Sequence, residues 1–317
     1  MCGNLSLTKE SMRYLDDLIQ NAEKYKVIIS KINDATVIDC GIKTEGSLAA
    51  GMLFTKISLG GLAKVNLELL NMNEETPLMA MQVETSYPAL SVLGCQAASW
   101  NINKDDFSGM VCGPGRALAQ KPSKIFKLLE YKDESEIAIL CIESDKLPTE
   151  EIVEYLAEKC NVKKQDLRLL MIKTSCLVEY MQMAARAIEL GVFRLVEQMN
   201  YPKERVLHAV GIGIIPPLSE NDEVSNDRVN NGLIYGTRLY LIIKSDSNDN
   251  IKELIKQIPS KSSKFYGRKF IDVFNEAGRD FANFDLSLLA PTEVIINDLR
   301  TGNLYQEGKI NIKMIVE

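Results

Sequence analysis

Four polar residues stand at steps of three and four in an otherwise apolar stretch, and their types suit acid/base chemistry. They are Glu179, Gln182, Arg186 and Glu189, and this spacing places them on one face of a helix. A carboxylate held by a guanidinium in a cleft can exchange protons or bind a cation. The same stripe also fits a solvent-exposed helix face, where an Arg186–Glu189 pair adds only about 0.2–0.5 kcal/mol. The stretch alone favours the solvent-exposed interpretation.

One long helix over residues 174–199 is predicted to carry this stripe. Apolar residues cover most of its circumference, as in a helix that is buried on more than one side. Alanines flank the arginine and leave room beside it. Strand-like and helix-like segments alternate through residues 80–200, which predicts a mixed α/β (α+β) fold.

The length and charge of the chain limit its class. It has 317 residues, 46% of them hydrophobic, and a net charge of −6. This charge gives no general positive field for nucleic acid, and no apolar run is long enough to span a bilayer. We therefore expect a cytoplasmic protein without nucleic-acid or membrane partners. We expect an N-terminal α/β portion over residues 1–85 and a larger α/β portion over 86–317 that carries the central helix.

The cysteines and the single histidine argue against metal chemistry. The seven cysteines are scattered without a CxxC pair, so no zinc-ligand set is expected, and we predict reduced, mostly buried thiols. His208 enters an apolar segment and is predicted to be structural, and no GxSxG elbow accompanies it. Carboxylates, arginine, lysine and backbone groups are therefore expected to carry any chemistry.

Two glycine-rich turns are candidate anion-binding sites. We predict a strand over residues 52–59 that Gly60-Gly61 end, with Lys56 placed to reach an anion. Residues 113–115 precede a short helix whose first turn holds Arg116, so backbone N–H groups and a guanidinium fork are available to an anion. A hairpin or bulge in the first case and a plain loop in the second explain the same residues.

A polar segment with paired prolines covers residues 213–232, and we predict it to be a long loop. Such loops are uncommon in compact domains and are often functional. Tyr235 and Gly236 are predicted to begin the strand that covers residues 237–245. Near the C-terminus, two strands joined by residues 298–303 are predicted to form a hairpin.

Six motifs, in this order and at these separations, together resemble methenyltetrahydromethanopterin cyclohydrolases. Each motif is weak by itself, but six in register over nearly the whole chain from residue 8 are a strong signal. Composition and periodicity do not show this function. The motifs are ATVIDCG, LFTKISLGGLA, CGPGRALAQKP, AARAIE, NDEVSNDRVNNGLIYG and LLAPTEVIINDLRTGNLYQEGK.

The resemblance implies two α/β portions of one subunit that enclose a pterin pocket, in a homotrimer without a metal or organic cofactor. Such enzymes reversibly hydrolyse the methenyl cation of a tetrahydromethanopterin-type carrier, which is the substrate, to the formyl carrier. The catalytic pair of the family, an arginine and a glutamate three residues later, matches Arg186 and Glu189. Candidate substrate-binding residues are Lys56, Gly60, Gly61, Gly113, Pro114, Arg116, Asn230, Asn231 and Tyr235.

The chain departs from the family pattern in three places. Thr85-Ser86-Tyr87-Pro88 stand where Thr-Asp-His-Pro is common. Val229-Asn230-Asn231 stand where Thr-Asn-Asp is common, and residues 111–116 read VCGPGR instead of Gly-Ser-Gly-Pro-Ala-Arg. Three hypotheses follow from the pattern and its departures. They are an active cyclohydrolase, a paralogue that binds the carrier without turnover, and an interaction protein whose polar stripe faces water.

Overall fold

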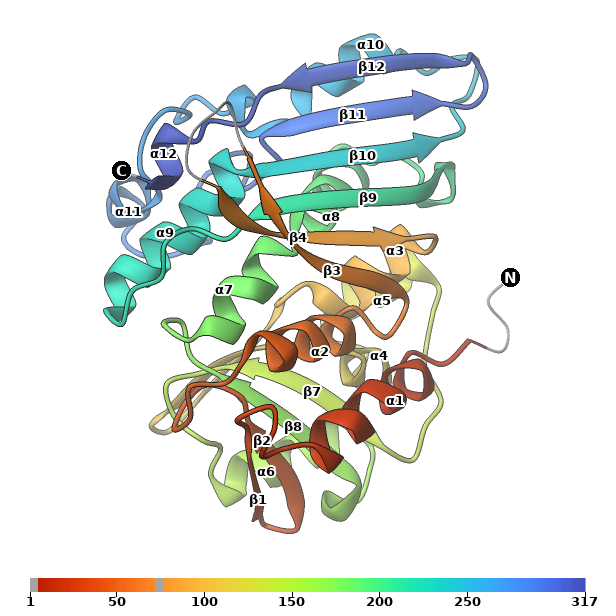
Figure 1. The fold of residues 1–317 in the computed structure, drawn as a ribbon. Coiled ribbons are helices and arrows are strands. Elements are labelled where there is room, and N and C mark those ends of the chain that lie inside the picture. Colours follow the sequence, from red (N-terminus) through yellow and green to blue (C-terminus); the bar gives the residue numbers. More distant parts are fainter. Residues whose placement is uncertain (1–4, 72–76, 317) are drawn as a thin grey trace. The chain divides into compact units, whose positions relative to one another are not determined.

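The computed structural model describes residues 5–71 and 77–316 (Figure 1). The chain forms two compact units, each built from two segments: unit 1 is Met1–Lys64 and Ala89–Gln182, and unit 2 is Val65–Pro88 and Met183–Glu317. The expected single division at residues 85/86 lies near one crossing between the units. The chain crosses between the units three times, after residues 64, 88 and 182, because each unit is built from two separate stretches of chain.

Unit 1 has a six-stranded mixed sheet in the order β1-β2-β8-β7-β6-β5. The central pairs β2·β8 and β7·β8 are parallel, and the outer pairs are antiparallel. The strands are β1 (Ile28–Ile32), β2 (Ala35–Asp39), β5 (Trp100–Lys104), β6 (Phe107–Cys112), β7 (Ala138–Glu143) and β8 (Leu167–Ile172).

Helices cover both faces of this sheet, because its central strands are apolar on both sides. On one face, α6 packs its buried residues Ile152, Val153 and Leu156 against Leu140 and other strand residues. On the other face, α1 and α2 share a core with the alternate strand residues (Figure 1). The helices of unit 1 are α1 (Leu7–Gln20), α2 (Leu48–Ser58), α3 (Pro88–Ser91), the π-helix η1 (Val92–Gln96), α4 (Gly115–Ala119), α5 (Ser123–Leu129), α6 (Glu150–Cys160) and α7 (Leu177–Ala184).

Unit 2 has a six-stranded sheet in the order β12-β11-β10-β9-β4-β3, in which only β10·β11 is parallel among the pairs described. The predicted C-terminal hairpin is confirmed, since β11 and β12 pair antiparallel around residues 299–302. The elements are β3 (Ala63–Leu70), β4 (Leu78–Thr85), α8 (Ala187–Val192), the π-helix η3 (Phe193–Gln198), β9 (Val206–Ile214), α9 (Asp222–Tyr235), β10 (Thr237–Ile243), α10 (Ile251–Leu254), α11 (Phe270–Glu276), β11 (Glu293–Asp298), β12 (Asn303–Gly308) and α12 (Lys313–Val316).

Three predictions for single segments are wrong: the strand over residues 52–59, the loop over residues 213–232, and the unbroken helix over residues 174–199, which is interrupted before residue 187. Residues 52–59 form most of helix α2 instead of a strand, with the Ser47 hydroxyl accepting from the Ala50 N–H at its start. Helix α2 is apolar on most of its surface, so its sequence carries no helical period to distinguish it from a buried strand. The predicted loop over residues 213–232 is largely helix α9, which ends at Tyr235.

The described cysteines are unbonded and buried, as predicted, while Cys2 lies outside the described residues. Burial raises the pKa of the thiols of Cys160 and Cys176 to about 12. Such thiols are protonated and unreactive at neutral pH. No helix in the described parts of the chain has both the length and the apolar character needed to cross a bilayer.

Candidate functional site

The predicted single helix over residues 174–199 is broken at the arginine. Helix α7 ends at Ala184 and α8 starts at Ala187. Of the two residues between them, Arg186 caps α8 with φ −91° and ψ 5°. Beyond α8 the chain widens into the π-helix η3. Arg186 and Glu189 therefore lie at the start of a new short helix and not in the middle of a long one.

The structure brings Arg186 and Glu189 together. Nη1 of the arginine lies 2.5 Å from Oε2 of the glutamate, and their side chains are only 8% and 14% exposed. This burial does not fit the solvent-exposed interpretation of the stripe. A charged hydrogen bond with so little water around it is shorter and stronger than a surface pair, and it fixes the carboxylate in one orientation.

The other half of the stripe forms a second pair. On α7, Nε2 of Gln182 donates to Oε2 of Glu179 at 2.6 Å, and both residues are almost fully buried. Buried polar groups must be hydrogen-bonded, and this side-chain bond meets that need one turn along the same helix. The sequence spacing therefore marks two buried polar pairs, and the break in the helix separates them.

Two glycines of β9 allow the break between α7 and α8 to pack directly against this strand. A Cβ atom at Gly213 of β9 would overlap the Ala184 carbonyl oxygen, and one at Gly211 would lie 3.0 Å from the Ala187 Cβ. Two residues apart, these glycines face the same side of β9. The close approach positions the chain on either side of Arg186. The GIG pattern in β9 was the signal for this packing in the sequence, and sequence reasoning missed it.

The first glycine turn, Gly60-Gly61, packs closely against other segments of unit 1. Gly60 and Gly61 have φ of +69° and +71°, and a Cβ at Gly61 would lie 2.5 Å from the backbone of Glu10 in α1. Both glycines are therefore required by the turn and by contact with α1. The turn interpretation accounts for them without a ligand.

The second turn is held internally as well. Gly113 has φ of +95°, and Pro114 is the N-cap residue of the five-residue helix α4. Arg116 is fully buried, with Nε donating to the Lys121 carbonyl at 3.0 Å and Nη2 donating to the Ser99 hydroxyl at 2.6 Å. These hydrogen bonds link the turn to neighbouring segments through the guanidinium group. The buried, hydrogen-bonded guanidinium is therefore poorly placed to bind an anion.

The candidates in α9 also have internal partners. Asn230 donates to a backbone carbonyl one turn earlier at 2.8 Å, and Oδ1 of Asn231 accepts from the Phe270 N–H at the start of α11 at 2.8 Å. The Tyr235 hydroxyl donates to the Arg268 carbonyl at 2.5 Å, and burial raises the pKa of this phenol to about 12. The three side chains fix α9 to the segments around it.

The single histidine is not a core residue. His208 is exposed on β9, and its Nδ1 lies 3.0 Å from the Ser86 hydroxyl at the end of β4. Tyr87 is 44% exposed. Two of the positions where the chain departs from the family pattern are thus at the surface of unit 2.

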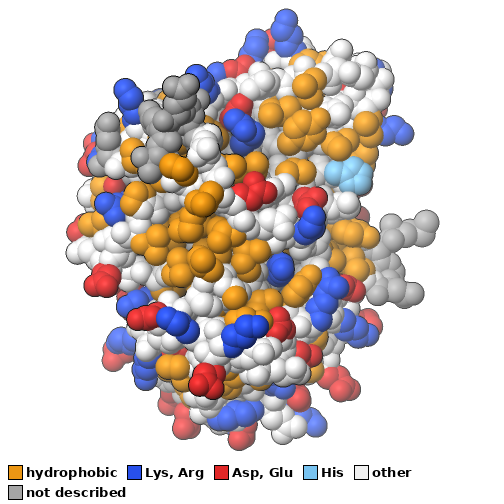
Figure 2. Space-filling view, in the orientation of Figure 1, with side chains coloured by type: hydrophobic (Ala, Val, Ile, Leu, Met, Phe, Trp, Pro, Cys, Tyr) orange, Lys and Arg blue, Asp and Glu red, His pale blue; other side chains and the backbone are white. Residues whose placement is uncertain are grey.

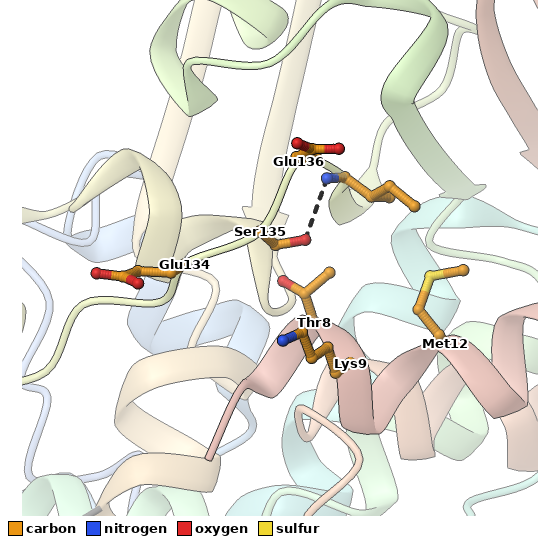
Figure 3. A pocket seen from close by; sticks show the side chains of 7 residues that line it. Thr8, Lys9, Met12, Glu134, Ser135 and Glu136 are labelled. Carbon is orange, nitrogen blue, oxygen red and sulfur yellow. Dashed lines mark hydrogen bonds between the residues drawn. The ribbon is translucent and has the colours of Figure 1, made fainter. Parts of the chain in front are cut away.

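An open pocket in unit 1 involves none of the predicted residues (Figure 3). It has a volume of about 660 Å³ and lies between the start of α1 and residues 134–137. Ser135 there accepts from the Ile137 N–H at 3.1 Å, and the Thr8 hydroxyl donates to Asp133 at 2.8 Å, so these hydroxyls hold the local backbone in place.

Within residues 5–71 and 77–316, no three histidine, cysteine or acidic side chains are placed to hold a metal ion.

Comparison with known proteins agrees with the motifs. A family model described as Cyclohydrolase (MCH) matches residues 6–317. The methenyltetrahydromethanopterin cyclohydrolase of Methanothermobacter marburgensis is 37% identical over 315 residues, which are 99% of this chain and 98% of that protein. The enzymes of that name from Methanocaldococcus jannaschii and Methanococcus aeolicus are 38% and 39% identical, each over 98% of this chain and 97% of theirs. The chain belongs to the cyclohydrolase (MCH) family.

Proposed function

We propose that this chain is a methenyltetrahydromethanopterin cyclohydrolase, which reversibly hydrolyses the methenyl cation of the carrier to the formyl carrier. Relatives at 37–39% identity over almost the full length carry that name. The observation that carries the proposal is the Arg186–Glu189 pair, whose 2.5 Å contact is largely withdrawn from water. The resemblance of the AARAIE motif implies that these two residues match the family's catalytic arginine and glutamate.

The pair suits the chemistry of this reaction. The substrate is an amidinium-like cation, and water adds to the carbon that bridges its two nitrogens. Glu189 accepts one proton of that water as the C–O bond forms, and returns it to the leaving nitrogen as one C–N bond breaks. The remaining hydroxyl proton of the adduct passes to solvent as the formyl C=O bond forms, so that the cation and water yield the neutral formyl carrier and one proton. General acid/base catalysis of this kind is worth about 10²–10⁴-fold. Arg186 orients the carboxylate through the short hydrogen bond between them.

We further propose that the enzyme works in the cytoplasm as a homotrimer, without a metal or organic cofactor. Lys56 is the best candidate for the anionic tail of the carrier. It is half-buried on α2, and its ammonium lies 5.4 Å from the centre of the Tyr14 ring. The other candidate residues are substrate-binding candidates from the resemblance alone, since the structure shows for them only internal hydrogen bonds and tight turns.

A second candidate function is carrier binding without turnover. The departures at Ser86 and Tyr87, both at the surface of unit 2, favour it. So does Asn231, which bonds the α11 backbone where the family commonly has an acid.

An absorbance assay of the methenyl chromophore separates the two functions. The protein is incubated with methenyl-tetrahydromethanopterin and, in parallel, with methenyl-tetrahydrofolate. We expect loss of the chromophore with the first carrier at a rate proportional to enzyme concentration. Binding seen by calorimetry without any loss of chromophore would favour the paralogue, and neither binding nor loss would refute both functions.

A further inference from the structure

Helix α8 carries Glu189 on the side that faces away from the unit 2 sheet. Ala187 lies on the sheet side, because its Cβ would be 3.0 Å from a Cβ at Gly211 of β9. Glu189 is two positions further along, which is about 200° around a helix, so its side chain points away from the strands. In Figure 1, α8 lies behind β9 and β10, and Figure 2 shows the opposite surface of these strands, where hydrophobic and charged side chains are mixed. The place of the carboxylate therefore depends on what α8 rests on.

Gly191 is the residue at which α8 rests on β10. A Cβ atom there would overlap Cδ2 of Leu239 on β10 and would lie 3.2 Å from Cγ of Pro291, which precedes β11. Carbon atoms that are not bonded to each other normally stay about 3.5–4.0 Å apart. Leu239 is fully buried, and a close-packed core leaves its side chain little room to move aside. An added methyl group at this position therefore pushes α8 away from the sheet.

Glu189 and Gly191 belong to one short, hydrogen-bonded segment. Helix α8 has only six residues, and the Leu190 N–H donates to the Arg186 carbonyl at 3.0 Å. The Phe193 N–H donates to the carbonyls of Glu189 and Leu190 where the π-helix η3 begins. A shift of Gly191 away from β10 is therefore carried to Glu189 and is not absorbed between them. A misplacement of ~1 Å at a reacting group can lower a rate on the order of 10²-fold.

We propose that Gly191 and Leu239 are positioning residues for the cyclohydrolase reaction, because their close packing sets the distance of α8 from the sheet and so the place of the Glu189 carboxylate. This inference rests on the proposed function, which gives Glu189 its catalytic role. Glycine and leucine have no side-chain group that can exchange a proton, so their effect on the reaction has to act through Glu189. Ordinary core packing would instead change the stability and leave kcat and KM of the folded protein unchanged.

The test adds and removes the overlapping groups, separately and together. Gly191→Ala adds a methyl group to the contact, Leu239→Ala removes the side chain that this methyl group would overlap, and a double variant combines the two changes. The matched control is Gly94→Ala in the π-helix η1 of unit 1, where an added Cβ would lie 3.4 Å from its nearest neighbours, an ordinary packing distance. kcat and KM are measured with the methenyl absorbance assay on samples that circular dichroism shows to be folded.

Both single variants are expected to lose activity that the double variant partly regains. We expect G191A to lower kcat by about 10–100-fold, because α8 is pushed off β10, and to change KM by less than about threefold, because the charge of Glu189 is retained. L239A should lower kcat about tenfold, since α8 loses the group on which it rests. The double variant should exceed either single variant in kcat by at least about threefold, and G94A should keep the kcat of the unmodified protein.

The positioning role is overturned if G191A keeps the kcat of the unmodified protein, or if the double variant is no more active than L239A. The second comparison decides the matter even where G191A fails to fold. Crystal structures of the same proteins give a readout without activity, and we expect the Glu189 carboxylate to move relative to β9 and β10 in each single variant. An unmodified protein that does not hydrolyse the methenyl carrier would refute the proposed function, and the crystal structures would then decide the placement alone. An unmoved carboxylate in G191A and L239A would refute the positioning role in either case.

Discussion

Replacing Glu189 by glutamine removes the charge of the proposed catalytic carboxylate and keeps its shape. The amide oxygen can still accept from Arg186, but the amide cannot take a proton from water at neutral pH. We expect kcat to fall by about 10²–10⁴, which corresponds to about 2.7–5.4 kcal/mol of lost transition-state stabilisation. KM should rise as well, because the substrate is a cation and Glu189 supplies a negative charge beside it.

The stability of the protein should change less than its activity. Removing one member of a fully buried ion pair costs about 3–5 kcal/mol, because a charge is left without its partner. Here the two side chains are 8% and 14% exposed, and glutamine keeps a hydrogen-bond acceptor. We therefore expect the free energy of unfolding to fall by about 1–3 kcal/mol. The variant should therefore remain folded at 25 °C.

The matched control is Glu276→Gln, which makes the same chemical change in the Arg268–Glu276 pair. That pair also has a 2.5 Å contact, but its side chains are 38% and 60% exposed. An exposed pair contributes little to stability, about 0–1 kcal/mol, and we expect no change in kcat. The methenyl absorbance assay and urea unfolding are run on both variants. Near-full hydrolysis by E189Q with an unchanged pH profile would refute the proposed role of Glu189.

Three further predictions concern packing, pH and thiols. Gly213→Ala puts a methyl group onto the Ala184 carbonyl, so we expect thermal unfolding to show a loss of about 1–3 kcal/mol in the free energy of unfolding. We also expect kcat to fall more than KM rises. Unchanged kinetics would argue against a positioning role for this strand. Burial acts to raise the pKa of Asp298, but hydrogen bonds from Thr301 and Ser245 outweigh it and leave this pKa below its ordinary value. A lowered pKa stabilises the fold above about pH 4, so Asp298→Asn should destabilise at pH 7, and the difference in urea unfolding should shrink as the pH falls below 4. The buried thiols should react with an aromatic disulfide reagent only after unfolding, and fast labelling of several cysteines in the native protein would contradict this.

The sequence alone determined the family and the position of the catalytic candidates. The spacing of Arg186 and Glu189 in AARAIE can be recognised without knowledge of the fold. Six motifs in register restrict the chain to one family. Strands with strong alternation and helices with clear caps were also predictable, such as α6, where the Thr149 hydroxyl accepts from the Ile152 N–H. These signals are local, because a cap or an alternating strand depends on residues only a few positions apart.

Tertiary structure decided the features that depend on distant segments. Helix α2 is apolar nearly all round and had no readable period. The break before Arg186 lies against Gly211 and Gly213 of β9, more than twenty residues away in the chain. Arg116 had the form of an anion site in its own segment, yet Lys121 and Ser99 engage its guanidinium. In each case a contact from elsewhere in the chain set the conformation or the role, and a single stretch of sequence does not contain its own packing partners.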